Sequence, residues 1–241
     1  MALPKIDSPI FELDLPLSGK HIRFRPFLVK EQKNLLMALE ADDVETINNN
    51  IKQVLNNCLL DDNLDIDTLP ILDIEYYFLN LRARSVSEVV EAKYKCNNPV
   101  DDKECGNIMD ANINVLDIKV TKDENIKEII QINDTIAVKL KYPTFSSIAN
   151  AAEVKDVNEI ALQMVVDSID TIYDGQQSFP AKESSKEELM EFVESLNQHQ
   201  FQKIQEFFEN LPKLDKLINL KCKKCGFDHV IVFEGLESFF D

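Results

Sequence analysis

Two pairs of cysteines, far apart in the chain, restrict the folds open to this sequence more than any other feature. Eight residues separate Cys96 from Cys105, two separate Cys222 from Cys225, and glycine follows each second cysteine. Each pair stands between two segments of alternating apolar residues, which predict strands. Glycine allows the tight turn that points backbone N–H groups at a metal-bound thiolate. Strand, cysteine turn and returning strand form half of a zinc ribbon, so the pairs predict one discontinuous four-cysteine site.

The long gap between the pairs leaves other interpretations open. Cys222 lies 126 positions after Cys96, far beyond the ordinary gap in such motifs. We therefore interpret the intervening chain as an insertion, with a structural Zn²⁺ joining distant parts of the fold and iron as the alternative metal. Cys96 could instead be an ordinary loop thiol, and the Cys222/Cys225 pair a redox dithiol, although such a dithiol normally opens a helix. Cys58 falls on the apolar face of a predicted helix, which indicates a buried small hydrophobe.

Composition excludes several classes of partner. The chain has 26 Lys+Arg against 43 Asp+Glu, a formal net charge of −17. Such a surface repels nucleic acid and anionic membranes, so we expect neither as a partner. No apolar stretch approaches the ~20 residues that span a bilayer, and the N-terminus lacks the features of a signal peptide. We expect a cytoplasmic protein, in which structural disulfides are rare.

The sequence offers no catalytic constellation. A catalytic zinc usually has a His or carboxylate ligand and an open position, whereas four cysteines close the coordination shell. Of the three histidines, His21 and His199 lie elsewhere, and only His229 could compete as a ligand. A strand position beside the cysteine turn is the simpler interpretation of His229. Because common hydrolase and phosphate-binding motifs are also missing, we expect no enzyme, no catalytic residues and no small-molecule substrate.

Helical and strand periodicities succeed one another along the chain and predict an α+β fold. An N-terminal hairpin over residues 13–24 precedes three helices, and the first predicted cap lies at Asp42 and Asp43. A central antiparallel β region contains a second hairpin at residues 130–142. Residues 173–185 are predicted to be a polar connector, and C-terminal helices follow a capping box at Ser185 and Glu188.

These elements group into four segments, which we expect to form one compact unit. The last segment ends in a Phe-rich tail, which we expect to pack against the preceding helix. The segments are 1–86 (arm, hairpin and helices), 87–116 (first half of the ribbon), 117–213 (inserted hairpin and helices) and 214–241 (second half of the ribbon and tail).

A recognisable signature occupies residues 21–33, His-Ile-Arg-Phe-Arg-Pro-Phe-Leu-Val-Lys-Glu-Gln-Lys. With this signature, the chain from about residue 17 to its end resembles the T-even-type bacteriophage baseplate protein family (baseplate hub, or central spike complex, assembly protein). Shorter matches to the family lie at residues 35–38, 81–86, 141–143, 207–212, 222–226 and 234–240.

The resemblance implies a non-enzymatic structural or assembly protein of a contractile phage tail baseplate hub. Its implied partners are other phage baseplate hub or tail proteins, met in the cytoplasm of the infected bacterium, with a place in the virion left open. One alternative is a transient assembly chaperone absent from the mature virion. A zinc-ribbon nucleic-acid-binding or regulatory protein and, last, a zinc hydrolase are the others.

Within the signature, we expect Arg23, Phe24, Arg25 and Phe27 to contribute a docking surface for a partner. Strand alternation places Phe24 opposite the two arginines, which could then pair with carboxylates of the partner. An equally open interpretation makes the phenylalanines part of the core and lets the arginines neutralise the protein's own acidic surface.

Overall fold

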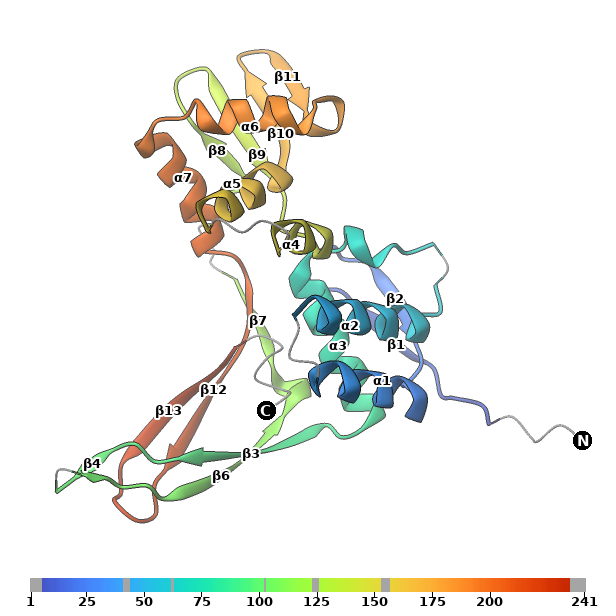
Figure 1. The fold of residues 1–241 in the computed structure, drawn as a ribbon, viewed down its shortest axis with the longest axis vertical. Coiled ribbons are helices and arrows are strands. Elements are labelled where there is room, and N and C mark those ends of the chain that lie inside the picture. Colours follow the sequence, from blue (N-terminus) through green and yellow to red (C-terminus); the bar gives the residue numbers. More distant parts are fainter. Residues whose placement is uncertain are drawn as a thin grey trace, which may run out of the picture. The chain divides into compact units, whose positions relative to one another are not determined.

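The computed structural model describes residues 6–40, 44–61, 63–101, 103–122, 126–152 and 157–234. Its contacts divide the chain into two compact units, where the sequence suggested one (Figure 1). Unit 1 takes its described residues from Met1–Leu64, Glu75–Thr121 and Lys213–Asp241, and unit 2 takes its own from Asp65–Ile74 and Lys122–Pro212. The segment interpreted as an insertion thus supplies most of unit 2. The predicted cap at Asp42 and Asp43 and the Phe-rich tail lie outside the described residues.

The N-terminal part of unit 1 combines a hairpin with helices, as predicted. Ile22 and Phe24 point from the hairpin into the core, and the ring of Phe24 meets Tyr77 edge-on at 5.4 Å between centroids. The Tyr77 hydroxyl donates to the Leu55 carbonyl at 3.2 Å, which satisfies a buried polar group. The elements are β1 (Phe11–Asp14), antiparallel to β2 (His21–Phe24), then α1 (Val29–Glu40), α2 (Val44–Cys58) and α3 (Ile71–Ser85), of which unit 1 holds Glu75 onward.

The rest of unit 1 is a set of antiparallel ribbons (Figure 1). Side chains alternate along them, so that Val90, Met109 and Ile113 are buried while Lys93 and Asp110 face outward. Strand β3 (Val89–Lys95) pairs with β6 (Ile108–Asn114), and β4 (Pro99–Val100) with β5 (Lys103–Glu104). Strand β12 (Lys213–Lys221) pairs with β13 (Asp228–Glu234) and β7 (Lys119–Thr121), and η2 (Val115–Asp117) follows β6.

Unit 2 builds its own core on a four-stranded antiparallel sheet of order β11-β10-β9-β8. Its buried residues include Val138, Leu140, Val165, Ile204 and Phe207. Its strands are β8 (Ile129–Gln131), β9 (Ile136–Leu140), β10 (Ile169–Asp174) and β11 (Gln177–Pro180). Its helices are η1 (Ile66–Thr68), α4 (Phe145–Ala152), α5 (Val157–Ser168), η3 (Ala181–Glu183), α6 (Lys186–Glu194) and α7 (Gln198–Glu209).

Most local predictions agree with these elements. The second hairpin is present as β8 and β9, and both halves of the capping box form between Ser185 and Glu188. The predicted connector at 173–185 is wrong, because β10 and β11 form a hairpin there around Gly175, whose φ is +59°. The mixture of helices and antiparallel sheets confirms the α+β class. Within the described part of the chain, no helix has the length and apolar character required to cross a membrane.

Candidate functional site

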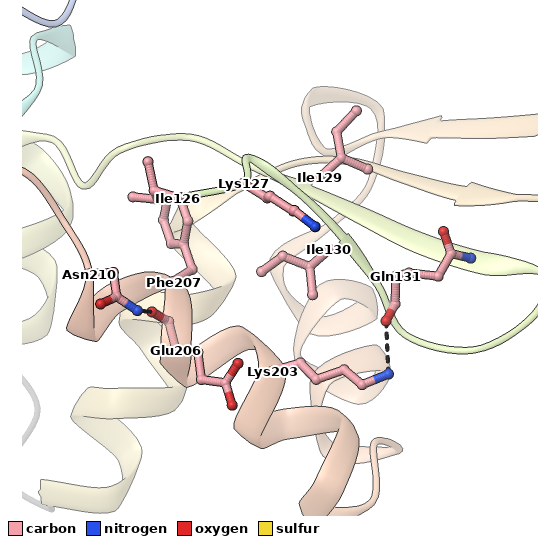
Figure 2. Close-up of a pocket in the computed structure, with 9 residues that line it drawn as sticks. All are labelled: Ile126, Lys127, Ile129, Ile130, Gln131, Lys203, Glu206, Phe207 and Asn210. Carbon is pink, nitrogen blue, oxygen red and sulfur yellow. Dashed lines mark hydrogen bonds between the residues drawn. The ribbon is translucent and has the colours of Figure 1, made fainter. Parts of the chain in front are cut away.

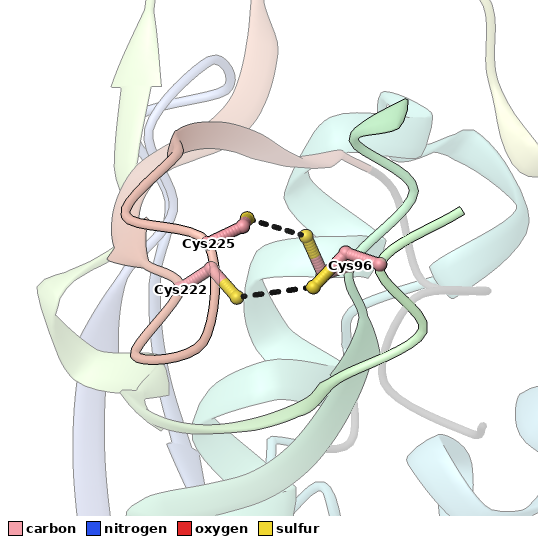
Figure 3. Close-up of side chains that lie close together, drawn as sticks. Cys96, Cys222 and Cys225 are labelled. Carbon is pink, nitrogen blue, oxygen red and sulfur yellow. Dashed lines mark hydrogen bonds between the residues drawn. The ribbon is translucent and has the colours of Figure 1, made fainter. Parts of the chain in front are cut away.

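The four predicted cysteines come together in unit 1. Cys96 and Cys222 directly follow β3 and β12, while Cys105 and Cys225 lie in the loops that lead to β6 and β13. Their four Sγ atoms lie within 4.8 Å of one another, with 3.6 Å between Cys96 and Cys225 and 3.8 Å between Cys105 and Cys222 (Figure 3). A disulfide needs about 2.05 Å. Four thiolates around a tetrahedral zinc at about 2.3 Å stand about 3.8 Å apart, so this group could hold a metal.

Both cysteine loops have the same backbone hydrogen bonds. In each loop, the N–H of the first cysteine donates to the carbonyl two residues past the second, at 2.7 Å for Cys96 and 2.9 Å for Cys222. The N–H of the following glycine returns to the first cysteine's carbonyl, at 2.9 Å for Gly106 and 2.8 Å for Gly226. These glycines have φ of +66° and +75°, a left-handed conformation that disfavours other residues. The tight turn expected at each Cys-Gly pair is therefore present.

The longer spacing of the first pair has a simple structural cause. Between Cys96 and Cys105, the chain forms the short hairpin β4–β5, and the Cys105 N–H donates to the Asn98 carbonyl at 2.9 Å. The hairpin turn includes Asp101 with φ of +49°. The first loop is thus a cysteine turn with a hairpin inserted in it, a feature that the sequence analysis missed.

Polar side chains surround the sulfur atoms. The amide nitrogens of Asn98 and Asn107 lie 3.7 and 3.5 Å from the sulfurs of Cys225 and Cys222. His229 Nε2 lies 3.1 Å from the sulfur of Cys96. Such donors stabilise thiolates and orient metal ligands, so they belong to the chemistry of the site. His229 contacts one cysteine from β13 and is not a member of the converging group of four.

Backbone donors and burial act in opposite directions on two of the thiols. Burial raises the pKa of the Cys96 thiol to about 12. The N–H groups of Cys225 and, more weakly, Lys224 outweigh burial at Cys222 and lower the pKa of that thiol to about 6. The Cys222 thiol is therefore better prepared than that of Cys96 to carry negative charge, and the thiolate is the form that binds metal.

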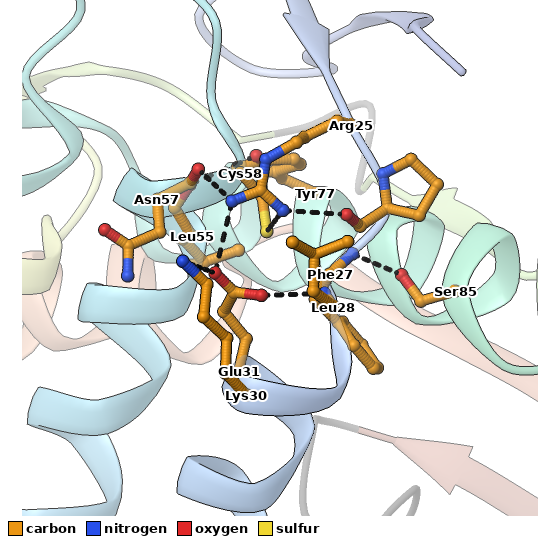
Figure 4. A network of polar contacts seen from close by, with 11 residues as sticks. Arg25, Phe27, Leu28, Lys30, Glu31, Leu55, Asn57, Cys58, Tyr77 and Ser85 are labelled. Carbon is orange, nitrogen blue, oxygen red and sulfur yellow. Dashed lines mark hydrogen bonds and ion pairs between the residues drawn. The ribbon is translucent and has the colours of Figure 1, made fainter. Parts of the chain in front are cut away.

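The signature residues form a second polar centre at the start of α1 (Figure 4). Arg25 Nη2 donates to Glu31 Oε1 at 3.1 Å and to the Asn57 carbonyl at 2.9 Å, and Nη1 donates to the Pro26 carbonyl at 2.9 Å. The other oxygen of Glu31 accepts from the Leu28 N–H at 2.7 Å. Glu31 is only 1% exposed and its Oε1 also lies 3.4 Å from Lys30 Nζ, so the ion pair of Arg25 with this buried carboxylate joins the end of β2 to α1 and the end of α2.

The position of Glu31 explains its protonation state. It stands three residues after Leu28, where a Glu side chain accepts from the first free N–H of a helix. Burial raises the pKa of Glu31, but the Leu28 N–H and the Arg25 guanidinium outweigh it and hold that pKa below its usual range. The carboxylate is thus charged at neutral pH and also favours the helix N-terminus.

The four proposed docking residues differ in their surroundings. Phe24 is buried, Arg25 is engaged in the network, and Phe27 is half-buried with its N–H donating to Ser85 Oγ at 2.9 Å. The Arg23 guanidinium makes a two-nitrogen contact with Asp61 Oδ1 at 3.1 and 3.0 Å. These contacts are the ones expected if the phenylalanines belong to the core and the arginines pair with the protein's own acidic residues. Partner docking through these four side chains stays a prediction.

Unit 2 contains an open cavity of about 470 Å³ beside β8 and α7 (Figure 2). The Lys203 ammonium donates to the carbonyls of Gln131 and Ile132 at 3.0 and 3.2 Å. The described lining holds no His, Cys, Ser, Thr or Tyr, so it provides no hydroxyl or thiol nucleophile and no imidazole base. Its nine residues are Ile126, Lys127, Ile129, Ile130, Gln131, Lys203, Glu206, Phe207 and Asn210.

Comparison with known proteins identifies the family. The sequence profile described as "T4 bacteriophage base plate protein" matches residues 8–241. The chain belongs to this family. It is also 25% identical over 232 residues to the "Baseplate hub assembly protein gp26" of Enterobacteria phage T4, covering 96% of this chain and 98% of that protein. No solved structure matches the chain. The T4 base plate family match confirms the resemblance drawn from the signature, and it spans both cysteine pairs.

Proposed function

We propose that this protein helps to build the baseplate hub of a contractile phage tail through protein–protein contacts. The observation that carries the proposal is the family match over residues 8–241, together with the name of the T4 relative. The partners are other baseplate hub or tail proteins, met inside the infected bacterium. The protein works without catalysis, and a structural Zn²⁺ at the four cysteines stabilises the ribbons of unit 1.

The donor set supports zinc. Four thiolates are soft ligands that suit zinc or iron, and Sγ distances of 3.6 and 3.8 Å agree with the edges of a tetrahedral site. Zinc bound by Cys96, Cys105, Cys222 and Cys225 would offset the negative charge of four thiolates held close together. Structural zinc of this kind contributes directly to folding stability.

A closed site also supports a role without catalysis. Among the described residues, the four cysteines are the group of potential ligands whose side chains converge on one point. Four sulfur ligands leave zinc no open position for water or substrate. The described lining of the cavity in unit 2 has no hydroxyl, thiol or imidazole side chain, so neither feature favours an enzyme.

Exposed apolar side chains support contacts with other proteins. Leu217 and Val232 are paired across β12 and β13, and with Val230 they are 62, 51 and 64% exposed. These three residues form an apolar stripe on the ribbon. Contiguous apolar surface of this kind is typical of protein interfaces.

Genetic complementation tests the assembly role. We expect a phage lacking this gene to accumulate baseplates without a hub, and the wild-type gene supplied in trans to restore hubs and infectious particles. Mass spectrometry of purified hub intermediates and virions then distinguishes a resident component from a transient chaperone, which would be found in the intermediates alone. Complete hubs in the absence of the gene would overturn the proposal.

Metal analysis tests the zinc. Protein purified without chelator should contain about one zinc per chain by plasma mass spectrometry, and Cys96→Ser and Cys222→Ser should each lose it. Loss in the Cys222 variant alone would show that the two loops do not share an ion. Wild-type protein without metal would overturn the metal site but not the assembly role.

A further inference from the structure

The outward face of α1 is apolar although it lies on a charged protein. Val29, Lys33, Leu36 and Met37 follow one another at helical spacing and share one side of the helix. Glu31 and Leu35 point the opposite way and are buried. Val29, Leu36 and Met37 are 82, 55 and 59% exposed, so none of the described residues of unit 1 covers this side of α1.

The exposed residues form a continuous patch, which we call the α1 face and define as Leu28, Val29, Lys30, Lys33, Leu36 and Met37. Single exposed apolar side chains are common, but three large ones on one side of a helix, with Leu28 directly before it, are typical of a binding surface. Methionine adds an adaptable contact. The Arg25–Glu31 network holds the first turn of the helix, so the α1 face is presented on a fixed element.

Charge distinguishes this face from the rest of the protein. Residues 28–37 contain two lysines and a single acid, Glu31, in a chain of net charge −17. Glu31 is buried, and its single carboxylate lies 3.1 Å from Arg25 and 3.4 Å from the ammonium of Lys30, whose side chain is 72% exposed. The exposed charge at the α1 face is therefore positive. Its complement is an apolar groove with a rim of Asp or Glu.

We infer that the α1 face binds an acidic-rimmed apolar groove of another baseplate hub protein, as an amphipathic helix binds in a groove. This inference rests on the proposed function and names the chemistry of the partner. A second copy of this chain fits less well, because a twofold contact through this face would oppose lysine to lysine. The remaining acidic surface would add further repulsion between copies.

Purified hub proteins of the same phage, immobilised one at a time for biolayer interferometry, provide the test. The perturbing variant is Val29→Glu with Leu36→Glu. Both positions are exposed, and glutamate suits a helix, above all at its first residue, so the fold should persist. Ile129→Glu is the matched control, since Ile129 is 53% exposed in unit 2. Circular dichroism and melting temperature verify that each variant is folded.

We expect the double variant to bind its partner at least about 30-fold more weakly, as for central interface residues, while the control binds like wild type. Lys33→Glu should slow association and weaken the dependence of the association rate on salt. Lys33→Arg keeps the charge and should associate like wild type.

If wild type binds a hub protein and the double variant binds equally well, or the control weakens equally, the α1 face is excluded and the proposed function stands. If wild type binds none of the hub proteins, the proposed function fails and this inference fails with it. Sedimentation of wild type as a dimer that the double variant abolishes would make a second copy the occupant and overturn the assignment.

Discussion

Replacing Glu31 with glutamine tests whether the buried ion pair of the signature stabilises unit 1. The carboxylate accepts from the Leu28 N–H at 2.7 Å and from Arg25 at 3.1 Å, and it is 1% exposed. Glutamine has the same shape but a single acceptor oxygen. Its amide nitrogen must therefore face either the Leu28 N–H or the guanidinium, donor against donor.

The structure sets the size of the effect. Removing one member of a buried ion pair costs about 3–5 kcal/mol. The Arg25 side chain is 19% exposed and keeps its bonds to the Pro26 and Asn57 carbonyls, which places Glu31→Gln near the lower end. We expect a loss of about 3 kcal/mol in the free energy of unfolding of unit 1 at pH 7. Arg25→Met should then cost much less in the Glu31→Gln background than alone, because the two residues form one interaction.

Urea denaturation followed by circular dichroism measures this loss, and hydrogen exchange of peptides from residues 21–40 assigns the transition to unit 1.

The pKa of Glu31 is lowered in the folded state. The stabilisation that the Glu31 carboxylate provides is therefore complete above the pKa of an unfolded glutamate, about 4.3, and disappears as the pH falls through the folded pKa. The difference between wild type and Glu31→Gln should therefore shrink below about pH 4. Glu91→Gln, at an exposed position on β3, is the control and should change stability by less than about 0.5 kcal/mol. Equal stabilities of wild type and Glu31→Gln at pH 7, or a difference that persists unchanged to pH 3, would refute the reasoning.

Four further outcomes can be measured directly. Cys58→Ala should retain the one zinc per chain expected of wild type in metal analysis, because Cys58 lies outside the converging group. Gly226→Ala should lower the melting temperature through about 1–2 kcal/mol of backbone strain, since φ is +75° while an added Cβ would meet no atom within 4 Å. Ser185→Ala should remove about 1 kcal/mol from unit 2 and speed hydrogen exchange at the start of α6. A chelator should increase exchange in β3, β6, β12 and β13 and leave β9 and α7 of unit 2 protected, and a uniform increase would contradict this.

Local signals made the cysteine site predictable. Each pair carries its own strand, turn and glycine, so the two halves could be recognised separately, and the likeness of the halves indicated that they meet. The β4–β5 hairpin was missed because its strands have two residues each, too few for any periodicity. The β10–β11 hairpin was missed for another reason. Its two-residue turn is Gly175-Gln176, and glycine at the first central position is a recognised hairpin signal that the polar residues after it obscured.

The surroundings of the signature residues could be predicted only in part from the sequence. Alternation along β2 correctly placed Phe24 and Arg23 on opposite faces, and the structure shows that the face of Phe24 is the buried one. It could not place Arg25, because the partners of that residue come from other elements. The Arg25 N–H donates to the Cys58 carbonyl at 2.9 Å, and the guanidinium reaches the neighbouring carbonyl of Asn57 at the end of α2. These contacts span more than 30 residues of sequence. Only the tertiary fold shows that the arginine stabilises the protein that carries it.

The distance between the cysteine pairs also explains why unit 2 needs a core of its own. A cross-link between Cys96 and Cys222 closes a loop of 126 positions, which would remove about 5 kcal/mol of chain entropy from the unfolded state. Zinc at the four cysteines would act as such a cross-link, provided that the loop between them folds without straining the ribbons. Unit 2 meets this condition, because Ile132, Val138, Ile169, Ile204 and Phe207 are buried among residues of its own segments. The ends of the insertion return to β7 and β12, which pair with each other through Val120 and Leu214. Because the insertion buries a core of its own, joined in unit 2 by Asp65–Ile74, the two cysteine loops can meet without straining the ribbons.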